Sequence, residues 1–417
     1  MRKSASVSYL RNAFSSALSA ASGLLVLVLA GCGTDARRAG DGVPDWQTET
    51  AVTTPVLPPP APPAPPTPDP IPEPLLTPPP LPPPAPTNEV VEMWVPLQTW
   101  CKANGLAAPC QVAVAPSPAY ALSTTNGVFV LRVGMQMAHW DGLEFRLGFA
   151  PQMAEGQPFV HALDLKKTLQ PLIGGAPMSF LRTNPTIVID PGHGGDDSGT
   201  KSVLGNRYER EYTLDWARRL GALLATNGWQ VFLTRSNDVH LSLSNRVAFA
   251  EEHKAGLFLS LHFNSAAPNA REAGLETYCL TPAGMFSSVT RGYDDDPGLI
   301  FPNNAFDAEN VQLAAWVHRA LLQVNGRNDR GVRRARYLSV LRAQNRPAIL
   351  IEGGYLSNPL EARRIADPAY RQRMAEAVAK VLIEKCDVRS PKSLVQAQPL
   401  EASSQRSEVM STSIQRP

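Results

Sequence analysis

Three apolar runs of strand length constrain what this chain can fold into, because each ends in a residue that can bind a metal ion or transfer a proton. Residues 186–189 lead into Asp-Pro-Gly and His193, residues 257–264 contain His262, and residues 348–354 contain Glu352 before a glycine pair. Short apolar runs bounded by glycine and proline are typical of buried strands. The carboxyl ends of strands in an open α/β sheet form one crevice, so we expect the three side chains to converge there.

The chain around these runs alternates between helical and strand patterns. We predict helices at 211–227, 243–254 and 310–324, and further strands at 229–234, 274–280 and 337–341. Such alternation predicts an α/β domain over residues 184–387, with a mostly parallel sheet flanked by helices on both faces. The segment 281–306 is longer than the usual connection of a few residues. It is either a gate over the site or an inert surface insertion, and the sequence favours neither.

Glu209 is a fourth candidate for the site, with two interpretations of equal weight. Asn206 followed by Glu209 three residues later matches a capping box at the start of a helix. The same carboxylate could instead bind a metal ion together with the two histidines.

Four ordered motifs carry a family resemblance. They are residues 189–195 (IDPGHGG), 208–210 (YER), 260–262 (SLH) and 351–358 (IEGGYLSN). In this order they resemble the zinc-dependent N-acetylmuramoyl-L-alanine amidases of the type 3 amidase family, over about residues 186–384. The resemblance implies that His193, Glu209 and His262 bind Zn²⁺ and that Glu352 is the catalytic carboxylate.

The chemistry of these residues agrees with the resemblance. Two histidines and one glutamate leave zinc a fourth position for water, as catalytic zinc sites require. Zinc lowers the pKa of that water to about 7 and polarises an amide carbonyl. Glu352 would then move the proton of the water to the leaving amine, although a carboxylate there could also orient a metal ligand.

The resemblance implies a substrate as well. We expect hydrolysis of the amide bond between N-acetylmuramic acid and L-alanine in peptidoglycan, with a protein activator as a further partner. One alternative keeps the metal site and cleaves another exported amide or peptide. The other is a peptidoglycan-binding scaffold or regulator without turnover, and Glu352 argues against it because a pure binder does not need that carboxylate.

Arginines at 327, 330, 333, 334 and 336 form the densest charge cluster. A solvated loop is the default interpretation, but guanidinium groups pair well with carboxylates, which peptidoglycan peptides carry. We therefore select Asn264, Arg333 and Arg334 as candidate substrate-binding residues. A net charge of +2 and the lack of a recognition motif argue against a nucleic-acid partner.

Residues 1–32 have the pattern of an export signal. A basic start precedes the apolar residues 23–29, which are too few to span a membrane. Residues 29–32 (LAGC) resemble the lipobox of bacterial lipoproteins, so we expect lipidation of Cys32. The predicted location is the periplasm, with a lipid anchor in a membrane. Gly33 after the cysteine favours the outer membrane over the inner one.

Residues 33–89 are proline-rich and predict a disordered tether that favours polyproline II, with a reach of ~100 Å when extended. Residues 90–180 predict a small α+β domain, similar to the copper-amine-oxidase-like N-terminal domains of cell-wall proteins, which imply no copper. Residues 388–417 predict a disordered tail.

Cysteine usage fits an oxidising compartment. Cys101 and Cys110 could close a small loop through a disulfide, whereas Cys279 and Cys386 are expected to be buried thiols.

Overall fold

The computed structural model describes residues 93–174, 178, 181, 183–205, 207–326 and 328–386. All of them belong to the second of two compact units, Pro84–Pro417. The predicted signal with Cys32, the tether and the tail lie outside the described residues. Within the described part of the chain, no helix is both long and apolar enough to cross a membrane.

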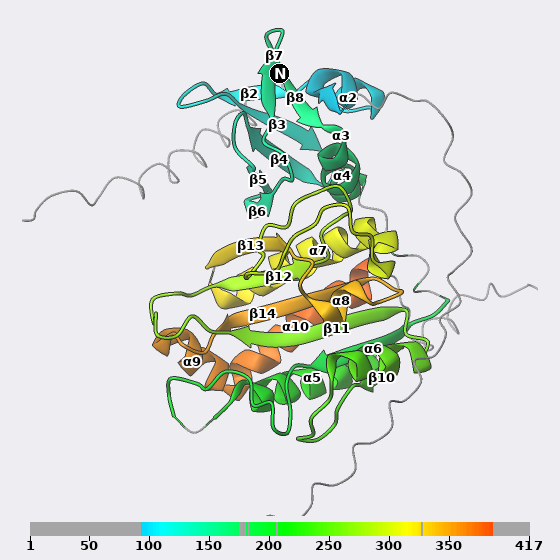
Figure 1. Cartoon of the computed structure of the whole chain (residues 1–417), viewed down its shortest axis with the longest axis vertical. Helices are drawn as coiled ribbons and strands as arrows, with labels where there is room; N and C mark the ends of the chain where they lie inside the picture. The colour runs from blue at the N-terminus through cyan, green and yellow to red at the C-terminus, as the bar shows by residue number, and fades with distance from the viewer. Residues whose placement is uncertain are drawn as a thin grey trace, which may run out of the picture. The chain divides into compact units, whose positions relative to one another are not determined.

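A six-stranded region of the main sheet carries the candidate site (Figure 1). Its order is β10 (Gln230–Leu233), β9 (Thr186–Pro191), β11 (Leu257–Asn264), β14 (Ala348–Tyr355), β12 (Leu275–Cys279) and β13 (Asp329–Arg334). Neighbouring strands in this region are parallel except β12, which is antiparallel to β14. The α/β fold class predicted from the sequence is therefore confirmed.

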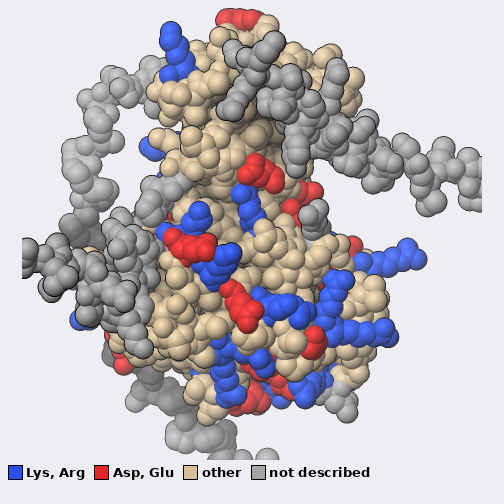
Figure 2. Space-filling view, turned by 180° about the vertical axis from the view of Figure 1, so that it is seen from behind, with Lys and Arg blue, Asp and Glu red and all other residues tan. Residues whose placement is uncertain are grey.

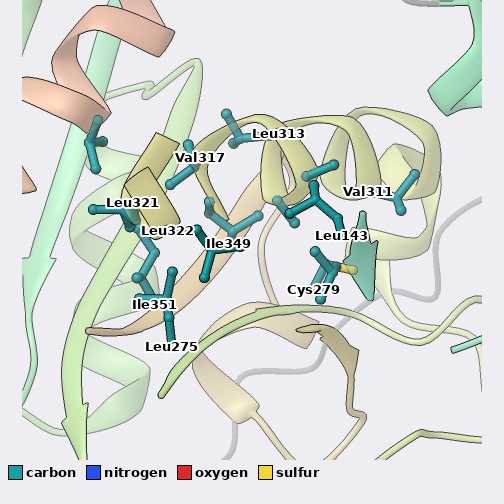
Figure 3. Close-up of a cluster of buried hydrophobic side chains, with 14 of the residues drawn as sticks. Leu143, Leu275, Cys279, Val311, Leu313, Val317, Leu321, Leu322, Ile349 and Ile351 are labelled. Carbon is teal, nitrogen blue, oxygen red and sulfur yellow. The ribbon is translucent and has the colours of Figure 1, made fainter. Parts of the chain in front are cut away.

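The sheet is buried on both faces, which explains why its central strands are continuous apolar runs rather than alternating ones. In β9, Ile187 and Ile189 belong to one hydrophobic cluster and Val188 to a second. Helices α5 (Glu209–Ala225), α7 (Asp307–Asn325) and α10 (Pro368–Lys385) contribute to the first cluster. Helices α6 (Leu243–Glu252) and α8 (Ser339–Arg342) contribute to the second. Figure 3 shows part of the first cluster, with Val317 and Leu321 of α7 near Ile349 and Ile351 of β14.

Several helix starts are capped by polar side chains. Ser242 Oγ accepts a hydrogen bond from the backbone N–H of Asn245 at the start of α6. Asn358 and Asp367 cap α9 (Pro359–Ala366) and α10, each directly before a proline. Serine, asparagine and aspartate are the residue types preferred at such N-cap positions.

The start of α5 differs from the predicted capping box. The backbone N–H of Tyr208 donates to Glu211 Oε1 over 3.2 Å, so Glu211 takes the role that the box assigned to Glu209. Glu209 is the first residue of the helix, and its carboxylate is free to point elsewhere.

The predicted strand at 337–341 is wrong, because α8 (Ser339–Arg342) occupies most of it. A short apolar run does not distinguish a buried helical turn from a strand, and Val340 and Leu341 are buried in the second cluster. The strand is β13 instead, which pairs with β12. Strand β13 includes three of the five clustered arginines. The interpretation of this cluster as a solvated loop is therefore wrong for most of its members.

The N-terminal part combines short strands with helical segments. They are β1 (Trp94–Pro96), α2 (Leu97–Ala103), β2 (Cys110–Ala113), β3 (Ala119–Thr124), β4 (Gly127–Arg132), β5 (Met137–Trp140), β6 (Leu143–Arg146), β7 (Gln152–Ala154), β8 (Gln157–His161), α3 (Ala162–Asp164), a π-helical turn (Leu165–Leu169) and α4 (Gln170–Gly174). Strands β2 to β6 form an antiparallel meander. Phe145 of β6 pairs with Val332 of β13, so the meander continues the main sheet.

The four described cysteines are free thiols. Cys101 is buried in α2 and Cys110 is exposed, so the disulfide considered for this pair is not formed in the structure. Cys279 and Cys386 are buried, as predicted.

Candidate active site

Tight turns after β9 bring two histidines together. His193 follows the strand with a left-handed φ of 63°. A side chain at Gly192 would clash with the ring of His262, and one at Gly199 would clash with His193 and Glu209. Glycine is therefore required at both positions for the close approach of the imidazoles.

The three predicted metal ligands converge on one point. His193 Nε2 lies 3.1 Å from Glu209 Oε2, and His262 Nδ1 lies 3.0 Å from Glu209 Oε1. One candidate ligand atom from each residue lies within 4.8 Å of the other two. Burial alone would raise the pKa of Glu209, but hydrogen bonds and charge from both histidines hold it far below its ordinary value. The carboxylate is thus negatively charged between two nitrogen donors, which is a donor set that suits a divalent cation.

Further groups orient His193 and Glu209, and no motif in the sequence pointed to them. Asp197 Oδ1 lies 2.8 Å from His193 Nδ1, which leaves Nε2 to face Glu209. Backbone N–H groups of Thr200 and Phe263 each donate to the Glu209 carboxylate over 3.0 Å. A carboxylate on the second nitrogen of a metal-binding histidine is a common arrangement. Its only trace in the sequence is an aspartate four residues after His193.

A buried ion pair supports the turn below the site. Asp190 at the end of β9 accepts hydrogen bonds from Thr234 and Ser260 and pairs with Arg246 of α6. The same guanidinium donates to the carbonyl oxygen of His193 over 2.9 Å. Asp190 thereby links β9, β11 and α6 directly beneath the candidate metal site.

Glu352 lies beside the three candidate ligands, on the strand next to that of His262. It pairs in register with His262 of β11 on one side and with Glu276 of β12 on the other. Only 8% of the residue is exposed, and its Oε2 has no hydrogen-bond partner in the described structure. Burial raises the pKa of Glu352 to about 7. A carboxyl group in this setting is suited to accept and release a proton near neutral pH.

A pocket of about 430 Å³ is lined in part by Glu276, the in-register neighbour of Glu352. Its lining comes from the ends of β11, β12, β13 and β14 and from the 281–306 segment, and it comprises Asn264, Ser265, Ala266, Glu272, Glu276, Tyr278, Val289, Arg291, Arg330, Arg333 and Tyr355. Two of the three predicted substrate-binding residues, Asn264 and Arg333, are in this lining.

The structure does not bring Arg334 to this pocket. Its guanidinium is buried and donates to Thr168 Oγ1 over 2.9 Å and to the carbonyl oxygen of Lys167 over 2.8 Å. Successive residues of a strand point to opposite faces, so Arg333 and Arg334 cannot both face one pocket. Arg291 takes its place in the lining, and its position in a loop without periodicity gave no signal in the sequence.

Several hydrogen bonds hold the 281–306 segment, and one group of them centres on Asp295. Asp295 accepts hydrogen bonds from the backbone N–H of Ser287 (2.6 Å), from Ser287 Oγ (2.7 Å) and from Arg336 Nη1 (2.7 Å). The side chain of Arg336 is fully buried. This anchor holds the part of the segment that supplies Val289 and Arg291 to the pocket wall.

Charges on the face that Figure 2 shows are mixed in sign. Among the described residues on the face that Figure 2 shows, basic and acidic side chains are interspersed. Binding of nucleic acid is associated with a basic patch or stripe, and this face does not present one in the part of the chain that is described.

Comparison with known proteins identifies a family that matches the region of the candidate site. Residues 187–384 match the Amidase_3 family, described as N-acetylmuramoyl-L-alanine amidase. The chain is 29% identical over 238 residues to N-acetylmuramoyl-L-alanine amidase AmiC of Escherichia coli O6:H1, covering 52% of this chain and 56% of the relative. It is 31% identical over 216 residues to AmiC of Neisseria meningitidis serogroup B, covering 47% and 51%.

A solved structure is similar over the same region. The catalytic domain of CwlV, an N-acetylmuramoyl-L-alanine amidase from Bacillus (Paenibacillus) polymyxa var. colistinus, has 32% sequence identity and a TM-score of 0.41, covering 49% of this chain and 99% of that chain. The chain spans about half the length of the two AmiC relatives. Through the segment 187–384, this chain belongs to the N-acetylmuramoyl-L-alanine amidase family.

Proposed function

We propose that this protein is a zinc-dependent amidase that hydrolyses the bond between the lactyl group of N-acetylmuramic acid and L-alanine in peptidoglycan. The observation that carries the proposal is the placement of Glu352 on the strand next to His262, with an unpartnered carboxylate oxygen beside three convergent ligand atoms. The family membership supplies the substrate class.

The donor set fits zinc. Two imidazole nitrogens and one carboxylate are ligands that catalytic zinc sites use, with one further position left for water or substrate. His193, Glu209 and His262 would hold the ion, and Asp197 would keep His193 in the ligating tautomer. When bound, zinc supplies a Lewis acid for the amide carbonyl and lowers the pKa of water to about 7.

The residues of the chain account for the proton movements. As a water oxygen attacks the carbonyl carbon, Glu352 accepts its proton. When the carbon–nitrogen bond breaks, Glu352 donates that proton to the nitrogen of the L-alanine. A carboxyl group with a pKa near neutrality can perform both transfers in one cycle. The products are a muramoyl carboxylate and a peptide with a free amino terminus.

Digestion of purified peptidoglycan by the full chain tests this proposal, with product masses as the readout. We expect free stem peptides that begin with L-alanine. Their release stops with a zinc chelator, returns when zinc is added, and is absent in Glu352→Ala. Release of other fragments, or release that persists in chelator, would overturn the proposal.

We further infer that the protein is periplasmic and lipid-anchored through Cys32, on the strength of the lipobox pattern in residues 29–32. A Cys32→Ala variant should move from the membrane fraction to the soluble periplasmic fraction. If the parent protein is already soluble, the anchor does not exist.

A further inference from the structure

A row of polar side chains crosses one face of the sheet beyond the candidate metal site. Val188, Phe258 and Leu350 belong to the hydrophobic cluster on this face, and the strand period of two places His262 and Glu352 on the same face. Glu276 pairs in register with Glu352, and Tyr278 of the same strand pairs with Arg333. The row therefore runs from β11 through β14 and β12 to β13.

The acidic groups in this row already have partners. Glu276 accepts from Arg330 Nε (2.9 Å), Asn264 Nδ2 (3.0 Å) and the hydroxyl of Tyr278 (2.8 Å). Arg330 also pairs with Glu272 over 2.6 Å. The Arg330 guanidinium thus forms ion pairs with both glutamates of the pocket lining, so few of its N–H donors remain for a ligand.

The other two arginines of the pocket lining, Arg291 and Arg333, do not form such ion pairs. Neither Arg291 nor Arg333 forms an ion pair or a side-chain hydrogen bond with another described residue, and Arg333 Nε is buried without a partner. Arg291 lies over the ring of Tyr337, with its Cζ 5.6 Å from the ring centroid. The lining contains three arginines and two glutamates, so it carries unpaired positive charge.

The proposed proton transfer indicates which part of the substrate lies near this positive charge. Glu352 donates its proton to the leaving nitrogen, so the leaving peptide lies on the Glu352 side of the metal. The pocket includes Glu276, which pairs in register with Glu352, and extends over β12 and β13. Two strand spacings are roughly 10 Å, which an extended peptide covers in about three residues.

We propose that Arg291 and Arg333 form a carboxylate-binding subsite for the second or third residue of the leaving peptide. This inference rests on the proposed function and extends it to specificity for acidic peptides. The planar guanidinium groups match the geometry of a carboxylate, and such charge-assisted bonds are strong in a partly buried pocket. An amidated peptide would leave both arginines without an anionic partner.

Matched muramoyl peptides test the subsite with the full chain. Three substrates differ only in having free carboxylates, a carboxamide at the second residue or a carboxamide at the third residue. We expect kcat/KM to fall about tenfold or more for one of the amidated substrates, mainly through KM. In Arg333→Gln and Arg291→Gln this discrimination ratio should fall toward one, whereas it should persist in Arg363→Gln, a control at an exposed arginine of α9.

A binding experiment separates failure of this inference from failure of the amidase proposal. Calorimetric titration with the free peptide, with and without the carboxamide, does not require turnover. We expect tighter binding of the carboxylate form to the parent and loss of that preference in Arg333→Gln. If the parent binds or cleaves the free and amidated forms equally well, or if both arginine variants keep the preference, the subsite does not exist.

Discussion

Arg246 Nη1 donates to Asp190 Oδ1 over 2.6 Å, and both residues are almost completely buried, with 3% and 1% of their surfaces exposed. Burial alone would raise the pKa of Asp190, but the charge of Arg246 and hydrogen bonds from Thr234 and Arg246 hold it below its ordinary value of 3.8. Since Arg246 also binds the carbonyl oxygen of His193, this pair couples the stability of the core to the position of a proposed metal ligand.

Replacing Asp190 with Asn should destabilise the protein by about 3–5 kcal/mol, because Arg246 would remain as a buried charge without its counterion. Urea denaturation of the two proteins measures this difference. Arg207→Gln is the control, since the pair of Arg207 with Glu211 is exposed and should contribute less than about 1 kcal/mol. Equal losses in the two variants would contradict the assignment.

The same pair predicts a pH dependence of stability. A carboxylate whose pKa is lower in the folded than in the unfolded protein contributes stability above the unfolded value, and this contribution is lost as the pH falls through the folded value. The parent should therefore lose stability below about pH 4, and Asp190→Asn should lose less over that range. If Asp190→Asn loses as much stability in acid as the parent does, Asp190 is not the cause of the loss.

Metal binding should depend on the three convergent residues and on Asp197. His262→Ala should abolish binding of one zinc ion per chain. Asp197→Asn should weaken it by about 10–100-fold, because His193 would lose the carboxylate that orients its ring. Titration with zinc against a competing chelator measures both effects. His139→Ala, at an exposed histidine of β5, should bind zinc like the parent, and a loss there would indicate a different site.

Glu352→Gln should separate metal binding from proton transfer. If Glu352 acts as the general base, the variant binds zinc like the parent and loses about 10²–10⁴-fold in kcat. Loss of zinc together with activity would instead assign Glu352 to the orientation of a metal ligand. Zinc titration and turnover measured on the same preparation distinguish the two roles.

Asp295 should control the order of the 281–306 segment. In Asp295→Asn the charge-assisted bond to Arg336 is lost, so we expect faster hydrogen exchange at the amide of Ser287, which donates to this carboxylate. If the segment is a gate, this variant also changes KM for peptidoglycan. Deletion of residues 285–298 with unchanged kcat and KM would show that the segment is an inert insertion.

The sequence alone was sufficient for the fold class and for three of the four candidate site residues. Continuous apolar runs such as 257–264 predict strands buried on both faces, and residues at their carboxyl ends share one edge of the sheet whatever their separation in the chain. The sequence pattern therefore places His193, His262 and Glu352 in one group. The role of Glu209 was not decided by the sequence, because a glutamate at the start of a helix fits both a capping box and a metal ligand.

Tertiary structure decided the features that depend on the direction of single side chains. Arg333 and Arg334 are neighbours in sequence, but pairing with β12 turns one toward the pocket and the other toward Thr168. The contributions of Arg246 and Arg291 arise from distant segments packing around one turn and one pocket, and no local pattern encodes them. For central strands such as β11, local sequence determines where the strand forms and ends, whereas the face of each side chain depends on strand register and on the packing of separate elements.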